Sequence, residues 1–204
     1  EVRVLQAQIT PHLIYNSLDA IISLIEQDCF EEALTMTHAL SGFFRTSLSK
    51  GQDWIPLEKE ISHINDYLVI LKIRYGHMLD YKIDIPETLF PVSILKMILQ
   101  PLIENAVYHG TKYVRHKGFI RITTCKIDEM IQFKVIDNGI GIPAEKLAEI
   151  RKELAKGIDS DFSIGYGLYN VNKRLLLYYG NDQKPTTIDS KYREGTTVTL
   201  MIPL

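Results

Sequence analysis

The stretch that decides the fold is Ile136-Asp137-Asn138-Gly139-Ile140-Gly141-Ile142-Pro143. It follows a strand-like run at residues 131–135 and precedes a segment with helical spacing. An acid at the end of a strand can accept a hydrogen bond from an exocyclic amine, and glycines let the backbone approach a ligand closely. The stretch therefore suits a purine nucleotide. The same Asp-Asn-Gly sequence also forms ordinary turns, so both interpretations are open at this point.

Length and composition limit the remaining possibilities. The chain has 204 residues, of which 46% are hydrophobic and 24% charged, as in one large or two small globular domains. A net charge of −2 gives no reason to expect a nucleic-acid partner. No secretory signal opens the chain, and no apolar run approaches the roughly 18 residues of a membrane span. Cys29 and Cys125 have no metal spacing, so we expect two reduced thiols in the cytosol.

The first residue is not Met, and residues 1–5 already have the pattern of a helix interior. We therefore expect a fragment of a longer protein, whose missing N-terminal part could hold membrane spans. Residues 1 to about 28 are predicted as one helix. Its apolar residues are Leu13, Leu18, Ile21, Ile22 and Ile25, and a helical wheel places His12, Asn16, Asp19 and Ser23 on the opposite face.

Pro11 lies inside this helix, directly before His12. A proline removes one backbone hydrogen bond and crowds the preceding turn, at a cost of roughly 3 kcal/mol in a helix interior. We therefore expect a local bend at His12, and a histidine that faces solvent or a partner.

A second helix is predicted over residues 31–49, and the short break before it predicts an antiparallel hairpin. Two amphipathic helices make a thin core. The hairpin therefore either pairs with a second copy in a four-helix bundle or packs on the rest of the chain. We expect a domain boundary near residues 49–53, which separates residues 1–50 from residues 51–204. A third helix is predicted from Pro56 to Tyr75, ended by Gly76.

The remainder alternates between strand and helix patterns. Strands are predicted at residues 81–85, 119–127, 131–136, 186–192 and 196–202, and helices at residues 92–109, 144–156 and 168–179. This order predicts an α+β sandwich with helices on one face of a mixed sheet. Four histidines have no evident partner and are expected at the surface: His38, His63, His77 and His116.

Four polar or glycine-containing segments follow one another along this part of the chain. They are the helix Leu99–Gly110, which carries Glu104 and Asn105, the opening stretch, the segment Ile164–Leu175, and the turn Glu194–Val198. An Asn oxygen suits a hard cation such as Mg²⁺. Glycines before a helix suit phosphate oxygens at its N-terminus. Each segment alone is weak evidence for a nucleotide site, whereas their order and spacing together indicate one.

In these segments the sequence resembles the GHKL (Bergerat) ATP-binding fold, and more narrowly the catalytic domain of sensor histidine kinases. The helix around Asn105 looks like the N box, Asp137–Gly141 like the G1 box, Gly165–Leu168 like the G2 box, and Gly195–Thr197 like the last glycine motif. Residues 5–18, Leu-Gln-Ala-Gln-Ile-Thr-Pro-His-Leu-Ile-Tyr-Asn-Ser-Leu, resemble the phosphoacceptor segment of LytS/YesM-type kinases.

The resemblance implies a role for each matching residue. His12 would be phosphorylated, and Asn16, one turn later, could orient its ring. Asn105 would hold Mg²⁺ between the phosphates of ATP. Asp137 would bind the adenine amino group, with the hydroxyl of Thr197 beside it.

The pocket and its lid, roughly residues 144–164, would be framed by Gly139, Gly141, Gly165, Gly167 and Leu168. His109 is either a ligand contact or a packing residue. Glu104 is either a catalytic or metal-site residue or a helix residue with a local hydrogen bond.

Three positions depart from the family pattern. The phosphoacceptor segment usually reads Asn-Pro-His-Phe, whereas this chain has residues 10–13 as Thr-Pro-His-Leu. Tyr108 stands where a basic residue is common, so a phosphate contact is either lost or supplied elsewhere, by Lys112 or Arg174. Pro101 stands where ATP-hydrolysing relatives carry the Glu that activates water, which disfavours an ATPase.

The resemblance thus implies a homodimeric histidine autokinase that uses ATP and Mg²⁺ and passes its phosphoryl group to the receiver domain of a response regulator. It also implies the cytoplasmic part of a bacterial membrane sensor. Two alternatives are open: a degenerate ATP-binding signalling module that acts through protein interaction, and a GHKL hydrolase or chaperone.

Overall fold

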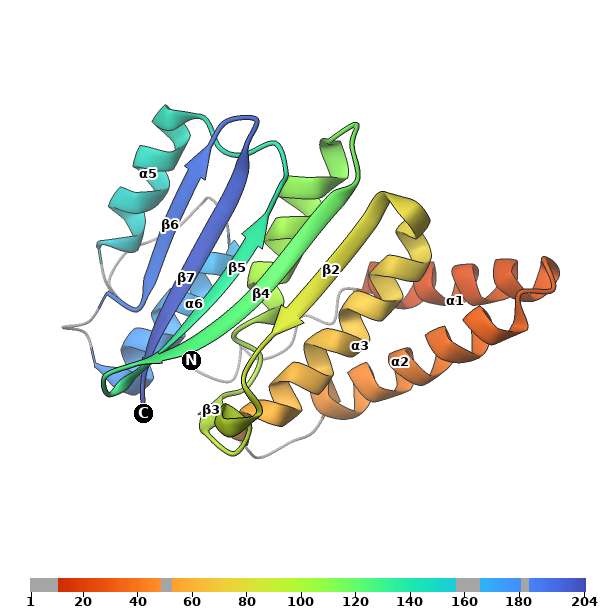
Figure 1. Cartoon of the computed structure of the whole chain (residues 1–204), viewed down its shortest axis with the longest axis horizontal. Helices are drawn as coiled ribbons and strands as arrows, with labels where there is room; N and C mark the ends of the chain where they lie inside the picture. The colour runs from red at the N-terminus through yellow and green to blue at the C-terminus, as the bar shows by residue number, and fades with distance from the viewer. Residues whose placement is uncertain (1–10, 49–52, 157–165, 181–183) are drawn as a thin grey trace.

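The structure is a computed structural model that describes residues 11–48, 53–156, 166–180 and 184–204 (Figure 1). The helices are α1 (Pro11–Glu26), α2 (Phe30–Leu48), α3 (Leu57–Tyr75), α4 (Gln100–Asn105), α5 (Ala144–Leu154) and α6 (Tyr166–Tyr179). Short helical turns are η2 (Gly76–Met78), η3 (Glu87–Leu89), η4 (Ala106–Gly110) and η5 (Thr111–Tyr113). The strands are β1 (Trp54–Pro56), β2 (Leu79–Asp84), β3 (Ser93–Leu95), β4 (Gly118–Ile127), β5 (Met130–Asp137), β6 (Thr186–Lys191) and β7 (Gly195–Pro203).

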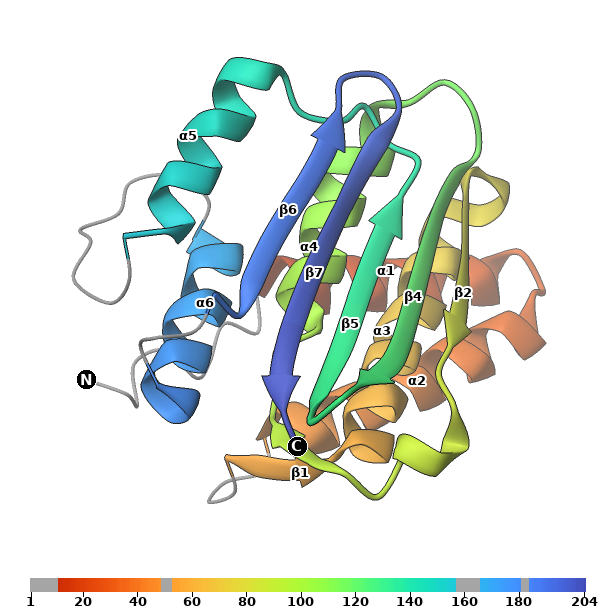
Figure 2. The same cartoon turned by 60° about the vertical axis from the view of Figure 1, so that its left-hand side comes forward.

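The five longer strands form one sheet in the order β2-β4-β5-β7-β6. β2 runs parallel to β4, and the other neighbours are antiparallel, so the sheet is mixed. Figure 1 shows α6 behind the sheet and Figure 2 shows α4 behind it, and none of the described helices covers its front face. This arrangement confirms the predicted α+β fold with helices on one face of a mixed sheet.

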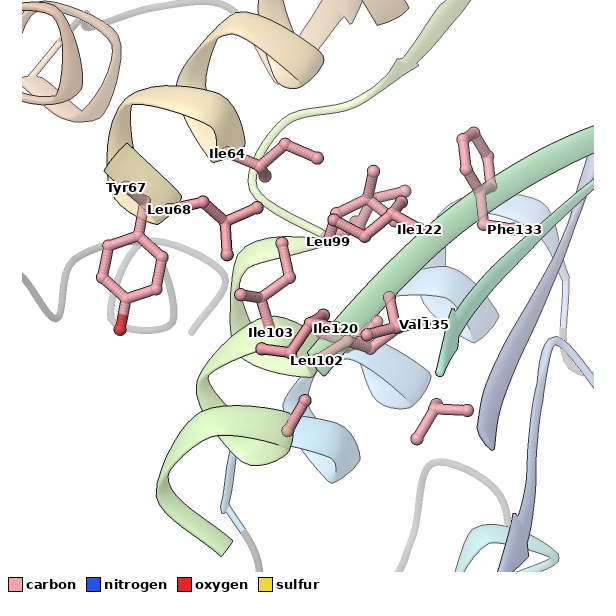
Figure 3. Close-up of a cluster of buried hydrophobic side chains, with 14 of the residues drawn as sticks. Ile64, Tyr67, Leu68, Leu99, Leu102, Ile103, Ile120, Ile122, Phe133 and Val135 are labelled. Carbon is pink, nitrogen blue, oxygen red and sulfur yellow. The ribbon is translucent and has the colours of Figure 1, made fainter. Parts of the chain in front are cut away.

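The core lies between the sheet and these helices. Along β5, Ile131, Phe133, Val135 and Asp137 are buried and the residues between them are half-buried, as the two-residue repeat of a strand requires. Each fully buried aliphatic or aromatic side chain contributes about 1.5–3 kcal/mol. Figure 3 shows where α3, the start of α4, β4 and β5 meet, with Ile64, Tyr67, Leu68, Leu99, Leu102, Ile103, Ile120, Ile122, Phe133 and Val135.

The helix predicted over residues 92–109 is wrong in its first half. Residues Ser93–Leu95 form β3, which pairs with β1, and Met97 follows with a positive φ of 58°. A non-glycine residue in that region does not continue an α-helix, so α4 begins only at Gln100. Pro101 then lies in the first turn of α4, where its missing N–H leaves no helix hydrogen bond unmade.

His63 also differs from the prediction, because it is fully buried. Its ring stacks on Phe43 of α2 with ring centroids 4.6 Å apart, and its Nε2 lies 2.7 Å from Oε1 of Gln100. Gln100 on α4 thus gives the buried ring a polar partner at Nε2, whereas its Nδ1 has no hydrogen-bond partner among the described residues. The other three histidines are exposed, as predicted: His38, His77 and His116.

α1 and α2 form the predicted hairpin, and the turn between them contains Asp28 at φ 59°. α2 packs along α3, and Met36 and Phe43 are fully buried. Leu13 of α1 belongs to the same continuous hydrophobic core. The inner face of the hairpin therefore packs on the rest of the chain, and the boundary near residue 50 stays a prediction.

The apolar residues of α1 divide between two faces, whereas the sequence predicted one. Leu13 is buried, but Tyr15, Leu18, Ile22 and Ile25 are 68%, 46%, 55% and 49% exposed. These four residues follow helical spacing and form an outer apolar stripe. Phe30, Leu34 and Leu48 of α2 are also exposed. Among the described helices, none combines the length and apolarity needed to cross a membrane.

Charged residues gather along β2, one end strand of the sheet. The Asp80 carboxylate accepts hydrogen bonds from Lys72 and Lys117, each at 2.8 Å, and Arg121 donates to Asp84 at 2.8 Å. The hydrogen bonds from Lys117 and Lys72 lower the pKa of Asp80 well below its usual value. Asp80 therefore keeps its negative charge in mildly acidic solution.

Candidate functional site

A cavity of about 630 Å³ lies between the inner face of the sheet and helices α4, α5 and α6. This volume is within the range of small-molecule and cofactor sites. Side chains from the sheet form an apolar wall of Val135, Ile188 and Val198. Polar groups reach the cavity from the end of β5, from α4 with η4, and from α5.

Asp137 is the last residue of β5, and its carboxylate lines the cavity although the residue is only 7% exposed. The backbone N–H of Gly139 donates to its Oδ1 at 2.8 Å. Burial raises the pKa of Asp137 to about 6, and hydrogen bonds from the backbone N–H groups of Gly139 and Thr196 oppose that rise. A buried carboxylate at a cavity wall can accept a hydrogen bond from the exocyclic amine of a purine.

The turn after Asp137 packs closely against η4 because glycines, Gly139 and Gly110, stand at the point of contact. A Cβ built on Gly139 would collide with the backbone of Gly110, and a Cβ built on Gly110 would lie 2.7 Å from Oδ1 of Asp137. The N–H of Ile140 donates to the Gly110 carbonyl at 3.2 Å. Gly110 is thus a site residue that the sequence interpretation missed. The sequence feature that could have indicated Gly110 is its place at the end of a predicted helix. A glycine there also fits an ordinary C-cap.

Gly141 joins the same turn to the hairpin of β6 and β7. It has a positive φ of 63°, and a Cβ there would collide with the Lys191 carbonyl. The next N–H, of Ile142, donates to Oγ of Ser190 at 2.8 Å. The positions of Gly139 and Gly141 therefore agree with their predicted role as the frame of a pocket.

Asn105 is the last residue of α4, and it lines the cavity next to the start of α6. A Cβ built on Gly167 would lie 3.7 Å from Nδ2 and 3.8 Å from Oδ1 of Asn105. Leu168 follows as a buried residue of the cavity wall, and His109 lines the cavity one turn after Asn105. A helix N-terminus beside an amide oxygen can hold phosphate oxygens and a hard cation together.

The donor set at this point fits Mg²⁺. No three His, Cys, Asp or Glu side chains gather into a metal-binding group within residues 11–48, 53–156, 166–180 and 184–204. Mg²⁺ does not need such a group, since it is usually held by one or two protein oxygens together with phosphate oxygens and water. Asn105 supplies one such oxygen in the cavity.

The predicted phosphoacceptor residues lie on a different element. His12 is in the first turn of α1, and Asn16 lies one turn later and is half-buried. The residues that line the cavity come from α4 to β7, and they include no described residue of α1. Gly165 lies outside the described residues. The structure thus brings Asn105, His109, Asp137, Gly141 and Leu168 together, and Asn16 does not line the same cavity.

Thr197 is a correction, because the structure does not bring it to this cavity. Thr196 pairs with Asp137 across the two strands and lines the cavity. Thr197 follows it by one residue, so its side chain points to the opposite face of the sheet. Thr196 therefore replaces Thr197 beside Asp137. Its Oγ1 lies 2.9 Å from Oγ of Ser190.

Glu104 is a second correction. It does not line the described cavity, and its Oε1 accepts a hydrogen bond from Nε2 of Gln100 at 2.9 Å. Burial raises the pKa of Glu104, and the Gln100 hydrogen bond opposes that rise. Of the two interpretations of Glu104, the geometry supports the locally hydrogen-bonded helix residue. Gln100 also contacts His63, so α3 and α4 share a short polar chain.

The departure at Tyr108 has a structural explanation. Its side chain is hydrogen-bonded to Tyr67 of α3 and does not line the cavity. Arg174 cannot replace a phosphate contact there, because its guanidinium donates to the carbonyls of Lys96 at 2.8 Å and Met97 at 3.3 Å. That sequence expectation is therefore wrong for Arg174.

Among the described residues, the lysines that line the cavity come from α5 and from the second residue after its end. They are Lys146 and Lys156, which pair with Glu149 and Glu153. The sequence interpretation missed them because a charged helix more often has a solvated face. The sequence feature that could have indicated these lysines is the position of α5, directly after the glycine turn. Lys112 is an exposed residue of η5 and does not line the described cavity.

Comparison with known proteins agrees with this geometry. Residues 1–79 match the family described as "Histidine kinase", and residues 92–204 match "Histidine kinase-, DNA gyrase B-, and HSP90-like ATPase". Sensor protein LytS of Bacillus subtilis is 33% identical over the whole of this chain. The chain belongs to the LytS-type sensor histidine kinases. It therefore carries the ATP-binding catalytic domain of that family.

The LytS-type chain covers only part of its named relatives. It spans 34% of Bacillus subtilis LytS and 33% of the sensor histidine kinase BtsS of Escherichia coli, to which it is 30% identical. It spans 70% of the Bacillus subtilis protein YwpD, described as putative and uncharacterized, at 35% identity. The chain thus has about a third of the length of LytS and BtsS.

Solved structures give the same fold at lower identity. The catalytic domain of histidine kinase ThkA aligns with a TM-score of 0.51 at 17% identity, over 74% of this chain and 93% of that one. The mycobacterial sensor histidine kinase MprB aligns with a TM-score of 0.51 at 16% identity, over 75% of this chain and 97% of that one. At these identities the likeness shows the fold of this LytS-type kinase alone.

Proposed function

We propose that this chain is the kinase part of a two-component sensor, in which ATP phosphorylates His12 and the phosphoryl group then passes to an aspartate of a response regulator receiver domain. The observation that carries the proposal is one cavity that unites the buried carboxylate of Asp137, the amide of Asn105 and the start of α6. Each group suits a different part of ATP.

The adenine amino group would donate to Asp137, at the closed end of the cavity formed by Gly110 and Gly139. The triphosphate would extend toward Asn105 and the N-terminus of α6, where backbone N–H groups and the helix dipole favour negative charge. When bound, Mg²⁺ would neutralise charge on the phosphate oxygens, with Asn105 as its protein ligand. Lys146 and Lys156 line the same cavity, each paired with a glutamate of α5 that also lines it.

The chemical step is a transfer to nitrogen. A neutral His12 imidazole uses the lone pair of its unprotonated ring nitrogen to form a bond to the γ-phosphorus. The bond from that phosphorus to the bridging oxygen breaks, and ADP leaves with the electron pair. The other ring nitrogen then releases its proton. Asn16, four residues later, can fix the ring orientation by accepting a hydrogen bond from that N–H.

The outer stripe of α1 supports a homodimer. Tyr15, Leu18, Ile22 and Ile25 would meet the same residues of a second copy, so that two hairpins form a four-helix bundle. In this proposal residues 1–50 serve dimerisation and phosphotransfer, and residues 51–204 bind ATP. Since the chain matches about a third of LytS, we also propose that it is the cytoplasmic end of a membrane sensor.

Incubation with γ-labelled ATP and Mg²⁺ tests the proposal. We expect a protein-bound label that is acid-labile and alkali-stable, absent from His12→Gln and from Asp137→Asn. The label should move to a purified receiver domain and be lost when its acceptor aspartate is replaced. ATP binding without label would instead favour the degenerate signalling module. Steady phosphate release without labelled protein would favour a hydrolase.

A further inference from the structure

The start of α4 is held from outside by a fully buried carboxylate. Glu60, on the first turn of α3, accepts hydrogen bonds from three consecutive backbone N–H groups: Met97 at 2.8 Å, Ile98 at 2.9 Å and Leu99 at 3.0 Å. The first N–H groups of a helix lack partners within it. No side chain at Leu99 caps α4, and Glu60, from a distant part of the sequence, instead binds the N–H of Leu99 and those of the two loop residues before it.

The same loop is held on its carbonyl side by α6. Arg174 donates to the carbonyl of Lys96 at 2.8 Å and to that of Met97 at 3.3 Å. Its guanidinium is largely buried, and the negative charge of Glu60 acts on it. Residues 96–99 thus receive an anion on their N–H groups and a cation on their C=O groups. We call this arrangement the α4 clamp.

The α4 clamp connects the two elements that meet at the cavity. Asn105 lies six residues after Leu99, and Gly167 lies seven residues before Arg174, each about 10 Å along a helix. The side-chain amide of Asn105 faces the start of α6, where a Cβ built on Gly167 would lie 3.7 Å from Nδ2 of Asn105. α4 continues directly into η4, and an isolated helix of this combined length, residues 100–110, is marginal in water. Its position therefore depends on what holds its ends.

We propose that Glu60 and Arg174 are positioning residues that set Asn105 against the start of α6, and so shape the metal and phosphate end of the nucleotide site. The inference rests on the proposed function, because it assumes that Mg²⁺ and ATP phosphates bind there. Neither residue touches the nucleotide; both act through residues 96–99. Because Glu60 belongs to α3, which packs on α2, the clamp also links the phosphoacceptor hairpin to that end of the site.

Two single substitutions remove the clamp from opposite sides. Glu60→Gln keeps the shape and one carbonyl oxygen, which can serve Ile98 and Leu99. Its NH₂ group then faces the N–H of Met97, so one hydrogen bond and the charge are lost. Arg174→Gln removes the contacts to Lys96 and Met97. Tyr81→Phe is the matched control. It deletes the hydrogen bond from Tyr81 to Asn65 at 3.2 Å, on the same helix α3 as Glu60, and that bond involves none of residues 96–99.

The first readout needs no nucleotide. Amide hydrogen exchange of a peptide spanning residues 96–105 should be faster in Glu60→Gln than in wild type, whereas peptides from β4 and β5 should be unchanged. The second readout is ADP affinity with Mg²⁺ and with EDTA. In both clamp variants we expect the factor by which Mg²⁺ raises ADP affinity to fall about tenfold. Substitution of residues that support a metal ligand typically has an effect of this size. Their affinity in EDTA should stay within about twofold of wild type, because Asp137 shares no partner with the clamp.

Each outcome has one meaning. The inference would be overturned if Mg²⁺ raised the ADP affinity of both clamp variants as much as that of wild type. It would also be overturned if the amide hydrogen-exchange rate of residues 96–105 in Glu60→Gln equalled that of wild type. An equal loss of the Mg²⁺ effect on ADP affinity in Tyr81→Phe would show general destabilisation and also overturn it. A wild-type chain that binds no nucleotide would overturn the proposed function and this inference with it, while the exchange experiment would still report whether Glu60 holds the loop.

Discussion

Asp137 has a raised pKa, about 6 against an ordinary value of 3.8, because its carboxylate is buried. A carboxyl with a raised folded-state pKa contributes stability at low pH that is lost as the pH rises from about 4 to 6. The shift corresponds to about 3 kcal/mol. We expect Asp137→Asn to raise the free energy of unfolding by about 1–3 kcal/mol at pH 7.5, with little difference from wild type near pH 4. Urea unfolding at the two pH values measures this.

ADP affinity of the same variant provides the functional control, and we expect it to be lost. A variant less stable than wild type at both pH values would contradict the prediction. It would show that the hydrogen bond from Gly139 favours the ionised carboxylate more than burial disfavours it.

Gly139 and Gly167 form a matched pair at the same site. Gly139→Ala would drive its Cβ into the Gly110 backbone, whereas a Cβ at Gly167 meets Pro101 at an ordinary 3.4 Å. We expect Gly139→Ala to lower the free energy of unfolding by about 1–3 kcal/mol, and Gly167→Ala to stay within about 0.5 kcal/mol of wild type. Chemical denaturation of the two variants checks this, and equal effects would contradict the close approach at Gly110.

At the scale of elements, the contact of α2 with α3 makes the hairpin part of the folded unit. Phe43 is fully buried between them and stacks on His63. We expect Phe43→Ala to cost about 3–5 kcal/mol. Helical circular dichroism and the fluorescence of Trp54, the single tryptophan, should report one shared unfolding transition. Two separate transitions would show instead that the hairpin unfolds on its own.

Elements with a regular period were predictable from sequence. The stripe of α3, the alternation of β4 and β5, and Asp137 at the end of β5 all follow local rules. Residues 92–99 were not predictable, because a continuous apolar run fits helix and strand alike. The positive φ of Met97 and the pairing with β1 depend on distant residues.

The errors within the site have the same origin. The sequence predicted that side chains of this strand alternate between two faces, but it did not predict which residues face the cavity. A shift of one residue places Thr196, not Thr197, beside Asp137. Glu104 and His63 were misplaced because both contact Gln100, and no local pattern reveals such a partner. Glu60 had no signal at all, since its three partners lie 37 to 39 residues away.

At the scale of the whole molecule, the outer stripe of α1 should decide the oligomeric state. Ile22 is 55% exposed in the single chain, so Ile22→Glu should leave the fold intact. In a dimer it would place two like charges in an apolar contact, and we expect the dimer dissociation constant to rise at least about tenfold. Sedimentation velocity measures this.

Thr35→Glu, at an exposed polar position of α2, adds the same charge outside the stripe and is the control. A wild-type chain that stays monomeric, or an Ile22→Glu variant that stays dimeric, would contradict a bundle built on α1. Circular dichroism of both variants separates loss of association from loss of fold.

The charged residues of β2 have a consequence for solubility. β2 ends the sheet, and an edge strand offers unpaired N–H and C=O groups to any other chain that can add a strand. Asp80, Lys82 and Asp84 place charge along that edge, and Lys117 and Arg121 extend it onto β4. Because the pKa of Asp80 is lowered, this edge stays charged in mildly acidic solution. The ion pairs that join β2 to β4 thus also oppose edge-to-edge aggregation of concentrated protein.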